Sequence, residues 1–416
     1  MSDLPFKGIR VLQFGSNASA PAAGRYFAQY GAEVIRIESN LKMDKMRFMM
    51  PITDVPPEEV LNSSLVFNNN NLSAKGIQAN LQKPETVELL KKLVKISDVV
   101  IENYSRGFMK RIGMSYDDLK EINPGIIMLS LSAVGDTGPH KGLVTYGASV
   151  VSITGMQSML GYSDGEPAID ISMTPDHVAP TLGVFYVTLA LHQRRFTGKG
   201  QFIDMGQASP VMYAQGEPLM DYSMNNRVAK RQGNWRVGFC PHNVYPCKPN
   251  SLEKSLPPQT REQWISICVE TEEEWTSLCD IMGNPGWTKE KRFSNYESRW
   301  QNQEELDKLI SEWTKNYSDV ELERWLQEVG VAAIALPNVP EMEFHPQLKA
   351  RDVFTVIDYT AAKDVIARND GLVISGIKPV IKRGPNLGEH NDYVYGELLG
   401  LSKEEIEQLK EEDIIK

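Results

Sequence analysis

The chain has 416 residues, of which 41% are hydrophobic and 24% are charged, the composition of an ordinary soluble protein with one or two domains. Asp and Glu total 54 against 44 Lys and Arg, and the net charge of −10 argues against nucleic-acid binding unless basic residues cluster. The four cysteines form no CxxC pair and have no zinc spacing, so we expect neither disulfides nor a metal site. Without a signal-peptide pattern or a membrane-length apolar run, we expect a cytoplasmic protein.

Short apolar strands alternate with helices along the first half of the chain. We predict strands at residues 9–14, 33–38, 98–102, 126–131 and 201–205. We predict helices at 22–30, from Pro84 onward, in a stretch that follows the strand 98–102 and runs to about Gly113, and at 179–196. The last of these helices is long and apolar and ends at the glycines of Thr197-Gly198-Lys199-Gly200. This alternation predicts an α/β fold with a parallel sheet and right-handed crossovers.

The amino-acid composition changes between about residues 225 and 317, where Trp, Pro and charged residues become frequent. Residues 249–259 are predicted to form a polar loop. We therefore predict a large domain beginning at 1–220, a small domain at 225–325, and a C-terminal segment at 330–416 that returns to the large domain. Ser402 and Glu405 form a capping box for a final helix.

The loop after the first strand is small and polar, but Gly15–Ala20 does not read GxGxxG, so dehydrogenase function loses its main support. A tight strand-to-helix turn is the favoured explanation of this loop on local grounds, although small side chains here would let a phosphate approach backbone N–H groups. The sequence contains no GxSxG, HExxH, EF-hand or P-loop motif. A hydrolase triad, metal chemistry and phosphoryl transfer are therefore disfavoured.

Asp176 lies directly before the long apolar helix, a position typical of an N-cap. A helix N-terminus would also lower the pKa of this carboxyl group and keep it ionised, as a nucleophile requires. We interpret the adjacent His177 as structural, because neighbours on a helix do not face each other. The basic stretches 42–47 and 106–111 are either solvated helix faces or sites for phosphate.

Beyond these patterns, the chain resembles the class III CoA-transferase family, which includes formyl-CoA transferase and carnitine CoA-transferase. The resemblance runs over nearly the whole chain in matching order. It is carried by segments 8–12, 20–21, 30–38, 80–85, 98–104, 111–113, 123–124, 135–139, 195–201, 241–247 and 387–391. Among these segments, the RFTGKGQ stretch that ends at Gln201 is a strong signature of the family.

The resemblance implies a nucleophile at Asp176, one helix-length before the TGKGQ turn. It implies that CoA or acyl-CoA is a substrate, with contacts at Ala18, Ser19, Ser39, Asn80, Leu81, Gln82, Asn103, Tyr104, Ser105, Arg111 and Tyr146. Basic residues that could meet the CoA phosphates are Lys42, Lys45 and Lys75.

Four positions depart from formyl-CoA transferase. Ala18 stands in place of a glutamine, Ser39 of an arginine, Gln82 of a lysine and Gly147 of an acidic residue. These departures argue against formyl-CoA or oxalyl-CoA as the substrate.

The resemblance also implies a Rossmann-like large domain built from both chain ends, a smaller α+β domain, and an interlocked homodimer. Loops 232–234 and 236–238 would cover the site. Trp235, Phe239 and Met156 are either core residues or the lining of an apolar acyl pocket. We expect transfer of CoA through an aspartyl anhydride and an aspartyl-CoA thioester, from succinyl-CoA to an aryl or bulky acid such as benzylsuccinate.

Two alternatives remain at this point. An α-methylacyl-CoA racemase would need a His/Asp acid–base pair, but residues 142–150 contain no histidine and His140 is displaced. A non-catalytic subunit of a heteromeric CoA-transferase would share the fold without the activity. The presence of Asp176 argues against this second alternative.

Overall fold

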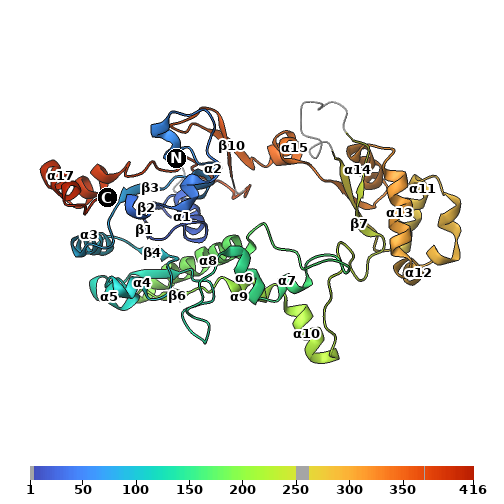
Figure 1. Ribbon diagram of the computed structural model, residues 1–416, viewed down its shortest axis with the longest axis horizontal. Coiled ribbons are helices and arrows are strands. Elements are labelled where there is room, and N and C mark those ends of the chain that lie inside the picture. The colour runs from blue at the N-terminus through green and yellow to red at the C-terminus, as the bar shows by residue number, and fades with distance from the viewer. Residues whose placement is uncertain (1–3, 250–261, 370) are drawn as a thin grey trace. The chain divides into compact units, whose positions relative to one another are not determined.

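The structure is a computed structural model that describes residues 4–249, 262–369 and 371–416 (Figure 1). Most of the polar loop expected at 249–259 lies outside the described residues. The chain divides into two compact units. Unit 1 comprises residues 1–158, 169–229 and 351–416, and unit 2 comprises residues 159–168 and 230–350. Both ends of the chain thus belong to unit 1.

Unit 1 is built on a six-stranded parallel sheet with the strand order β3-β2-β1-β4-β5-β6. Its strands are β1 (Arg10–Gln13), β2 (Glu33–Glu38), β3 (Lys75–Gln78), β4 (Val99–Glu102), β5 (Ile127–Ser130) and β6 (Phe202–Asp204). The predicted parallel α/β sheet is confirmed. The strand order reverses between β1 and β4. In sheets of this kind, ligands bind in a crevice at the carboxyl edge beside the reversal, and below we call the carboxyl edge between β1 and β4 the crevice.

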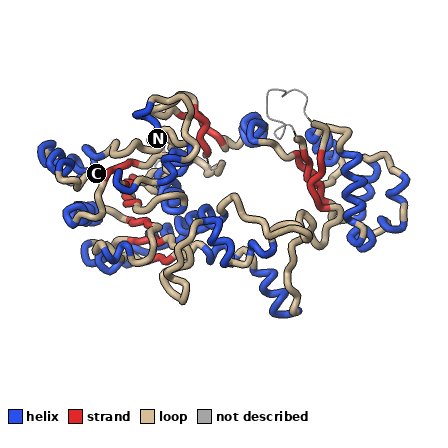
Figure 2. Tube along the Cα trace, viewed as in Figure 1, coloured by secondary structure: helices blue, strands red, loops and turns tan. Residues whose placement is uncertain are grey.

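Helices cover both faces of this sheet. On one face, α1 (Ser19–Gln29) and α8 (Thr174–Thr197) pack against each other and against residues such as Val11 and Leu129. On the other face, α3 (Pro84–Lys95) and α5 (Tyr116–Ile122) pack with the C-terminal π-helix η7 (Asp392–Leu398) and α17 (Lys403–Glu411) (Figure 2). The C-terminal segment therefore completes the core begun by the first hundred residues.

The other helices of unit 1 are short, except α10. They are α2 (Leu65–Asn70), α4 (Phe108–Arg111), α6 (Gly147–Ile153), α7 (Met156–Met159, at the boundary of the unit), α9 (Ala208–Tyr213), α10 (Gly216–Asn225) and the 3₁₀ helices η1 (Asn40–Lys42), η2 (Lys45–Phe48) and η3 (Pro57–Asn62). Strands β10 (Phe354–Ile357) and β11 (Val365–Arg368) form an antiparallel hairpin in the returning segment.

Unit 2 has an antiparallel sheet of β7 (His242–Pro246), β8 (Trp264–Cys268) and β9 (Ala332–Ala335). Its helices are α11 (Glu272–Ile281), α12 (Tyr296–Gln301), α13 (Gln303–Thr314), α14 (Asp319–Glu328), α15 (Val339–Phe344), α16 (Pro346–Ala350), η5 (Gly286–Lys289) and η6 (Lys291–Phe293). Residues 330–350, expected in the returning segment, lie in unit 2 because β9 completes its sheet.

Within the residues described, no helix is both long enough and apolar enough to cross a membrane.

Candidate active site

The loop after β1 and the loop after β4 are joined across the crevice by Asn103. The Asn103 side chain accepts a hydrogen bond from the N–H of Ser16 at 3.0 Å and donates to the carbonyl of Ser16 at 2.8 Å. A β-carbon at Gly15 would collide with this amide, and the φ of Gly15 is +97°. Only glycine fits there, so the turn and the asparagine form one rigid edge of the crevice.

Ser19 extends this edge toward the far side of the sheet. Its buried hydroxyl group accepts hydrogen bonds from Asn103 Nδ2 at 2.9 Å and from Gln207 Nε2 at 3.0 Å. Gln207 also donates to the carbonyl of Leu131, just beyond β5. The structure thus brings together two predicted CoA contacts, Ser19 and Asn103. It adds Gln207, which no sequence motif marked.

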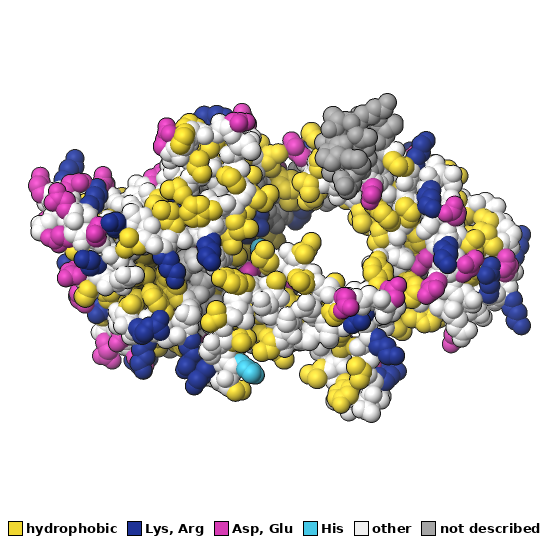
Figure 3. Space-filling view, viewed as in Figure 1, with side chains coloured by type: hydrophobic (Ala, Val, Ile, Leu, Met, Phe, Trp, Pro, Cys, Tyr) yellow, Lys and Arg dark blue, Asp and Glu magenta, His cyan; other side chains and the backbone are white. Residues whose placement is uncertain are grey.

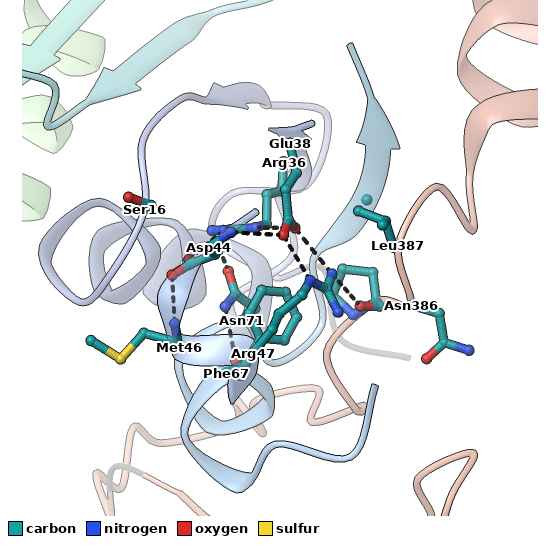
Figure 4. Close-up of polar contacts among 12 residues, drawn as sticks. Ser16, Arg36, Glu38, Asp44, Met46, Arg47, Phe67, Asn71, Asn386 and Leu387 are labelled. Carbon is teal, nitrogen blue, oxygen red and sulfur yellow. Dashed lines mark hydrogen bonds and ion pairs between the residues drawn. The ribbon is translucent and has the colours of Figure 1, made fainter. Parts of the chain in front are cut away.

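A buried ionic network supports the first loop from the side of β2 (Figure 4). The Asp44 carboxylate binds Arg36 at 2.6 Å, and the Glu38 carboxylate binds Arg47 at 2.7 Å. The Arg47 guanidinium lies 3.6 Å from the centre of the Phe67 ring. Every charge in this network faces an opposite charge, as a low-dielectric environment requires.

The network reaches the crevice through Asp44, whose carboxylate accepts the N–H of Asn17 at 3.1 Å. Asn17 has a φ of +64°, so this bond holds a backbone conformation that few residues adopt readily. Arg47 is only 1% exposed and fully engaged, and it is therefore not a phosphate ligand. That part of the prediction for the basic stretch 42–47 is wrong, because Glu38 neutralises the arginine.

Asp176 lies in the first turn of α8, where its side chain is half-buried. The expectation of an N-cap is wrong, since Met173 is the N-cap and Asp170 accepts the N–H of Thr174 at 2.9 Å. The Asp176 carboxylate makes no hydrogen bond or ion pair within the described part of the chain. Burial raises its pKa to about 6, the opposite direction from the one expected.

Gly147, the first residue of α6, lies against the Asp176 carboxylate. A β-carbon at Gly147 would collide with Asp176 Oδ2 and would lie 3.0 Å from Asp176 Cγ. Tyr146, a predicted CoA contact, is the N-cap of α6 and is 62% exposed. The first turn of α6 thus approaches the carboxylate with backbone alone. Its first N–H groups have no intrahelical acceptor.

His177 points to different neighbours from those of Asp176. Withdrawal of the ring from water lowers its pKa, and the charges of Arg368 and Arg25 lower it further. The two arginines thus disfavour the charged form of the ring, and no hydrogen bond to Asp176 is seen among the described residues. Its predicted structural role stays a prediction.

The remaining predicted CoA contacts are spread along the carboxyl edge. Ser39 caps η1 by accepting the N–H of Leu41. Asn80 is buried and its amide donates to the carbonyl of Asp413, while its Oδ1 accepts the N–H of Gln82. Leu81 packs at the border of the core. These three residues of the 80–82 stretch therefore follow β3 and are fixed by the C-terminus.

Residues 103–111 hold the predicted contacts after β4. Burial raises the pKa of Tyr104 to about 12, and its hydroxyl group lies at the backbone of Gly15. Ser105 is exposed. Arg111 is exposed as well, with its guanidinium 5.6 Å from the centre of the Phe108 ring. Tyr104 thus closes the crevice at Gly15, whereas Ser105 and Arg111 remain open to solvent.

The structure separates the three lysines considered for the phosphates. Lys75 begins β3 at the amino edge, pairs with Glu33 at 3.1 Å and lies 3.6 Å from the centre of the Tyr393 ring. Glu33 and Tyr393 thus hold Lys75 at the edge of the sheet opposite to the predicted CoA contacts. Lys42 and Lys45 are exposed at the carboxyl side.

Unit 2 contains the loops expected to cover the site. Trp235 donates its indole N–H to Asp307 at 2.8 Å, and Asn243 and Tyr245 donate to the same carboxylate. A β-carbon at Gly233 would collide with the Tyr162 ring. The loops 232–234 and 236–238 are thus anchored within unit 2. Met156 lies in unit 1, and Phe239 lies beside His242 in unit 2.

Glu102, at the end of β4, escaped the sequence analysis. It accepts the N–H of Tyr104 at 2.8 Å, and burial raises its pKa to about 7. The nearby carboxylates of Asp136 and Asp204 raise this pKa further. Only its place at the carboxyl end of a predicted strand could have marked it.

The sheet order and its crevice place the chain among the doubly wound α/β proteins. The profile of CoA-transferase family III matches residues 6–391, so the chain belongs to this family and is a CoA-transferase. The predicted resemblance is therefore confirmed.

The relatives agree with this assignment. The chain is 29% identical to succinyl-CoA–D-citramalate CoA-transferase of Chloroflexus aurantiacus, over 99% of this chain and 98% of the relative. It is 28% identical to succinate–glutarate CoA-transferase of Agrobacterium fabrum, over 95% and 96% of the two chains. A crystal structure of a CAIB/BAIF family protein from Brucella suis superimposes with a TM-score of 0.84 at 26% identity, covering 95% of this chain and all of that one.

Proposed function

We propose that this enzyme moves CoA from succinyl-CoA to a second carboxylic acid, with Asp176 as the covalent carrier. The observation that carries the proposal is the environment of the Asp176 carboxylate. It is half-buried, lacks any donor within the described residues, and faces the bare backbone of Gly147. A nucleophile with its lone pairs free and its hydration reduced suits attack on a thioester.

The first half of the reaction releases the donor acid. Asp176 Oδ attacks the thioester carbonyl of the donor, the C–S bond breaks, and an acyl-aspartyl anhydride and CoA thiolate form. The thiolate then attacks the aspartyl carbonyl, the anhydride C–O bond breaks, and the donor leaves as a free carboxylate. CoA is now held as a thioester on Asp176, so the activation of the donor is conserved.

The second half repeats these steps with the acceptor. The acceptor carboxylate attacks the aspartyl-CoA carbonyl, CoA thiolate leaves, and a second anhydride forms. The thiolate attacks the acceptor carbonyl and restores the Asp176 carboxylate. Each tetrahedral oxyanion needs donors, which the free N–H groups at the start of α6 supply next to Asp176.

The ionisation of Asp176 is compatible with this role. With a pKa of about 6, the group is more than about nine-tenths ionised at pH 7.5. Burial raises the pKa because it destabilises the charged form, and the same effect makes the carboxylate a better nucleophile than a hydrated one.

CoA itself is assigned to the crevice between β1 and β4. Its rim is the first loop, fixed by Asn103 and Asp44, and the exposed residues after β4. The names of the relatives favour succinyl-CoA as the donor and a dicarboxylic acid as the acceptor. Benzylsuccinate, the bulky acid expected from the sequence, is itself a dicarboxylic acid.

Trapping of the intermediate tests the proposal. The purified enzyme is incubated with succinyl-CoA, treated with hydroxylamine and digested. We expect a hydroxamate on the peptide that contains Asp176, and Asp176→Ala should show neither this product nor transfer of CoA. Transfer that survives in Asp176→Ala refutes the mechanism. Exchange of solvent deuterium into the α-carbon of an acyl-CoA without exchange of acids would instead establish the racemase.

We also propose that the chain forms a homodimer in the cell. α10 has no buried residue, and Leu219, Met220, Tyr222 and Met224 expose more than half of their surface (Figure 3). Exposed apolar faces of this kind mark surfaces that bind a partner. The named alpha and beta subunits of succinyl-CoA–L-malate CoA-transferase favour a heteromer as the second candidate. Transfer by the chain purified alone would exclude the non-catalytic subunit.

A further inference from the structure

The segment from Asp44 to Arg47 is fixed at both ends by buried ion pairs. Asp44 and Arg47 are each 1% exposed, and they pair with Arg36 and Glu38 respectively. Asp44 also caps η2 by accepting the N–H of Met46 at 2.9 Å. Lys45 is one of the two residues between these anchors, so its backbone is held in place although its side chain is exposed (Figure 4 shows the anchors).

Lys45 lies over the ring of Tyr146, with its ammonium nitrogen 5.9 Å from the ring centre. Tyr146 immediately precedes Gly147, whose backbone lies against the Asp176 carboxylate. The positive charge is thus directed to the side of the crevice where the reacting acyl group must lie. No carboxylate of the described residues forms an ion pair with Lys45.

We propose that the Lys45 ammonium binds the second carboxylate of a dicarboxylic acyl group or acid while the first reacts at Asp176. This inference rests on the proposed function and names the group that selects its substrate class. An unpaired cation beside a site that handles carboxylates gives a dicarboxylate one more ionic contact than a monocarboxylate of equal length. Lysine suits this contact, since its flexible stem lets one charge follow acids of different length.

A phosphate of CoA is the other anion that could reach a lysine on this rim. The contacts favour the carboxylate, because Lys45 rests on the residue next to Gly147, at the nucleophile. The nucleotide part of the ligand belongs to the crevice between β1 and β4, lined by Asn103 and Ser19. Lys92, an exposed lysine of α3 outside the predicted CoA contacts, serves as the control.

The test compares Lys45→Met with wild type in three measurements. We expect the KM for succinate as acceptor to rise about fivefold to tenfold, the range for one partly exposed ionic contact. The kcat/KM for butyryl-CoA, which has the same chain length without the second carboxylate, should stay within twofold. The inhibition constant of free CoA should also stay within twofold. Lys45→Arg should recover most of the succinate KM, and Lys92→Met should behave as wild type.

Two results would overturn the inference while leaving the proposed function intact. An unchanged KM for succinate in Lys45→Met means that the lysine does not bind the substrate carboxylate. Equal losses for succinate, butyryl-CoA and free CoA mean that it contacts a phosphate. If wild type transfers CoA between no pair of acids, or Asp176→Ala remains active, the proposed function fails and the inference fails with it.

Discussion

The contact between Gly147 and Asp176 allows one added methyl group, in Gly147→Ala, to test whether the Asp176 carboxylate is the reacting group. Gly147→Ala places a β-carbon 3.0 Å from Asp176 Cγ and 3.2 Å from Met173 Cβ, and in collision with Asp176 Oδ2. Ordinary carbon contacts are about 3.5–4.0 Å, so the carboxylate must move by about 1 Å or more. Misplacement of a reacting atom on this scale lowers the rate about 10²-fold.

The same substitution should not weaken the fold. Gly147 is the first residue of α6 and its φ is not positive, so its backbone conformation is open to alanine and the strain is confined to the contacts with Asp176 and Met173. Replacement of glycine by alanine in a compatible helical position stabilises a protein by about 0.4–1 kcal/mol. Because the collision at Asp176 offsets this gain, we expect a kcat about 10²-fold below wild type together with a midpoint of thermal unfolding close to that of wild type.

Steady-state transfer and the rate of hydroxamate formation at Asp176 measure the first effect, and calorimetry measures the second. Gly286→Ala is the control, because Gly286 also begins a helical segment but has nothing within 4 Å of an added β-carbon. A Gly147→Ala enzyme with wild-type kcat would refute the argument that the reacting carboxylate lies at this contact.

Three further predictions follow from the charges around the site. The kcat/KM should fall tenfold per pH unit below about pH 6, because the raised pKa of Asp176 removes its nucleophilic form there; an acid limb near pH 4 contradicts this. Asp176→Asn should raise the free energy of unfolding by about 1–2 kcal/mol at pH 8, discounted for partial exposure. This gain should vanish below about pH 4, where the carboxyl group is protonated in both states; an Asn variant less stable than wild type at pH 8 is the contrary result. Asp44→Asn leaves Arg36 and Arg47 to share Glu38, so that one buried positive charge is uncompensated, and it weakens the bond to Asn17. Denaturant titration should therefore show a loss of about 3–5 kcal/mol. The exposed control Asp117→Asn should leave the stability almost unchanged, and equal losses in the two variants would mean that the network is not a buried one.

Apolar runs made most of the sheet predictable. The segments 9–14, 33–38, 98–102 and 126–131 are buried on both faces, and such strands read as nearly continuous Val, Ile and Leu. β3 was missed, because Lys75–Gln78 offers only one large apolar side chain to the core. Its strand character comes from pairing with β2, a long-range contact that no local window contains.

The polar part of the site was less predictable for the same reason. Arg47 looked like a candidate for phosphate, but its partner Glu38 lies on another element, so its neutralisation appears only in three dimensions. Gln207 joins Ser19 across 188 positions of sequence and belongs to no motif. Asp176 was found through family resemblance, while local sequence assigned it to a cap that Met173 and Asp170 provide instead.

Asp44 and Asp176 show how two identical side chains in one unit take opposite roles. Asp44 is surrounded by donors, the Arg36 guanidinium and the N–H of Asn17 among them, so its lone pairs are occupied and it serves as structure. Among the described residues Asp176 has no such donor, and the backbone of Gly147 lies against its carboxylate, so its lone pairs remain available; burial raises its pKa. Carboxylates with contrasting environments carry different functions in one site. The absence of a side chain at Gly147 therefore matters as much to this enzyme as the presence of one at Asp176.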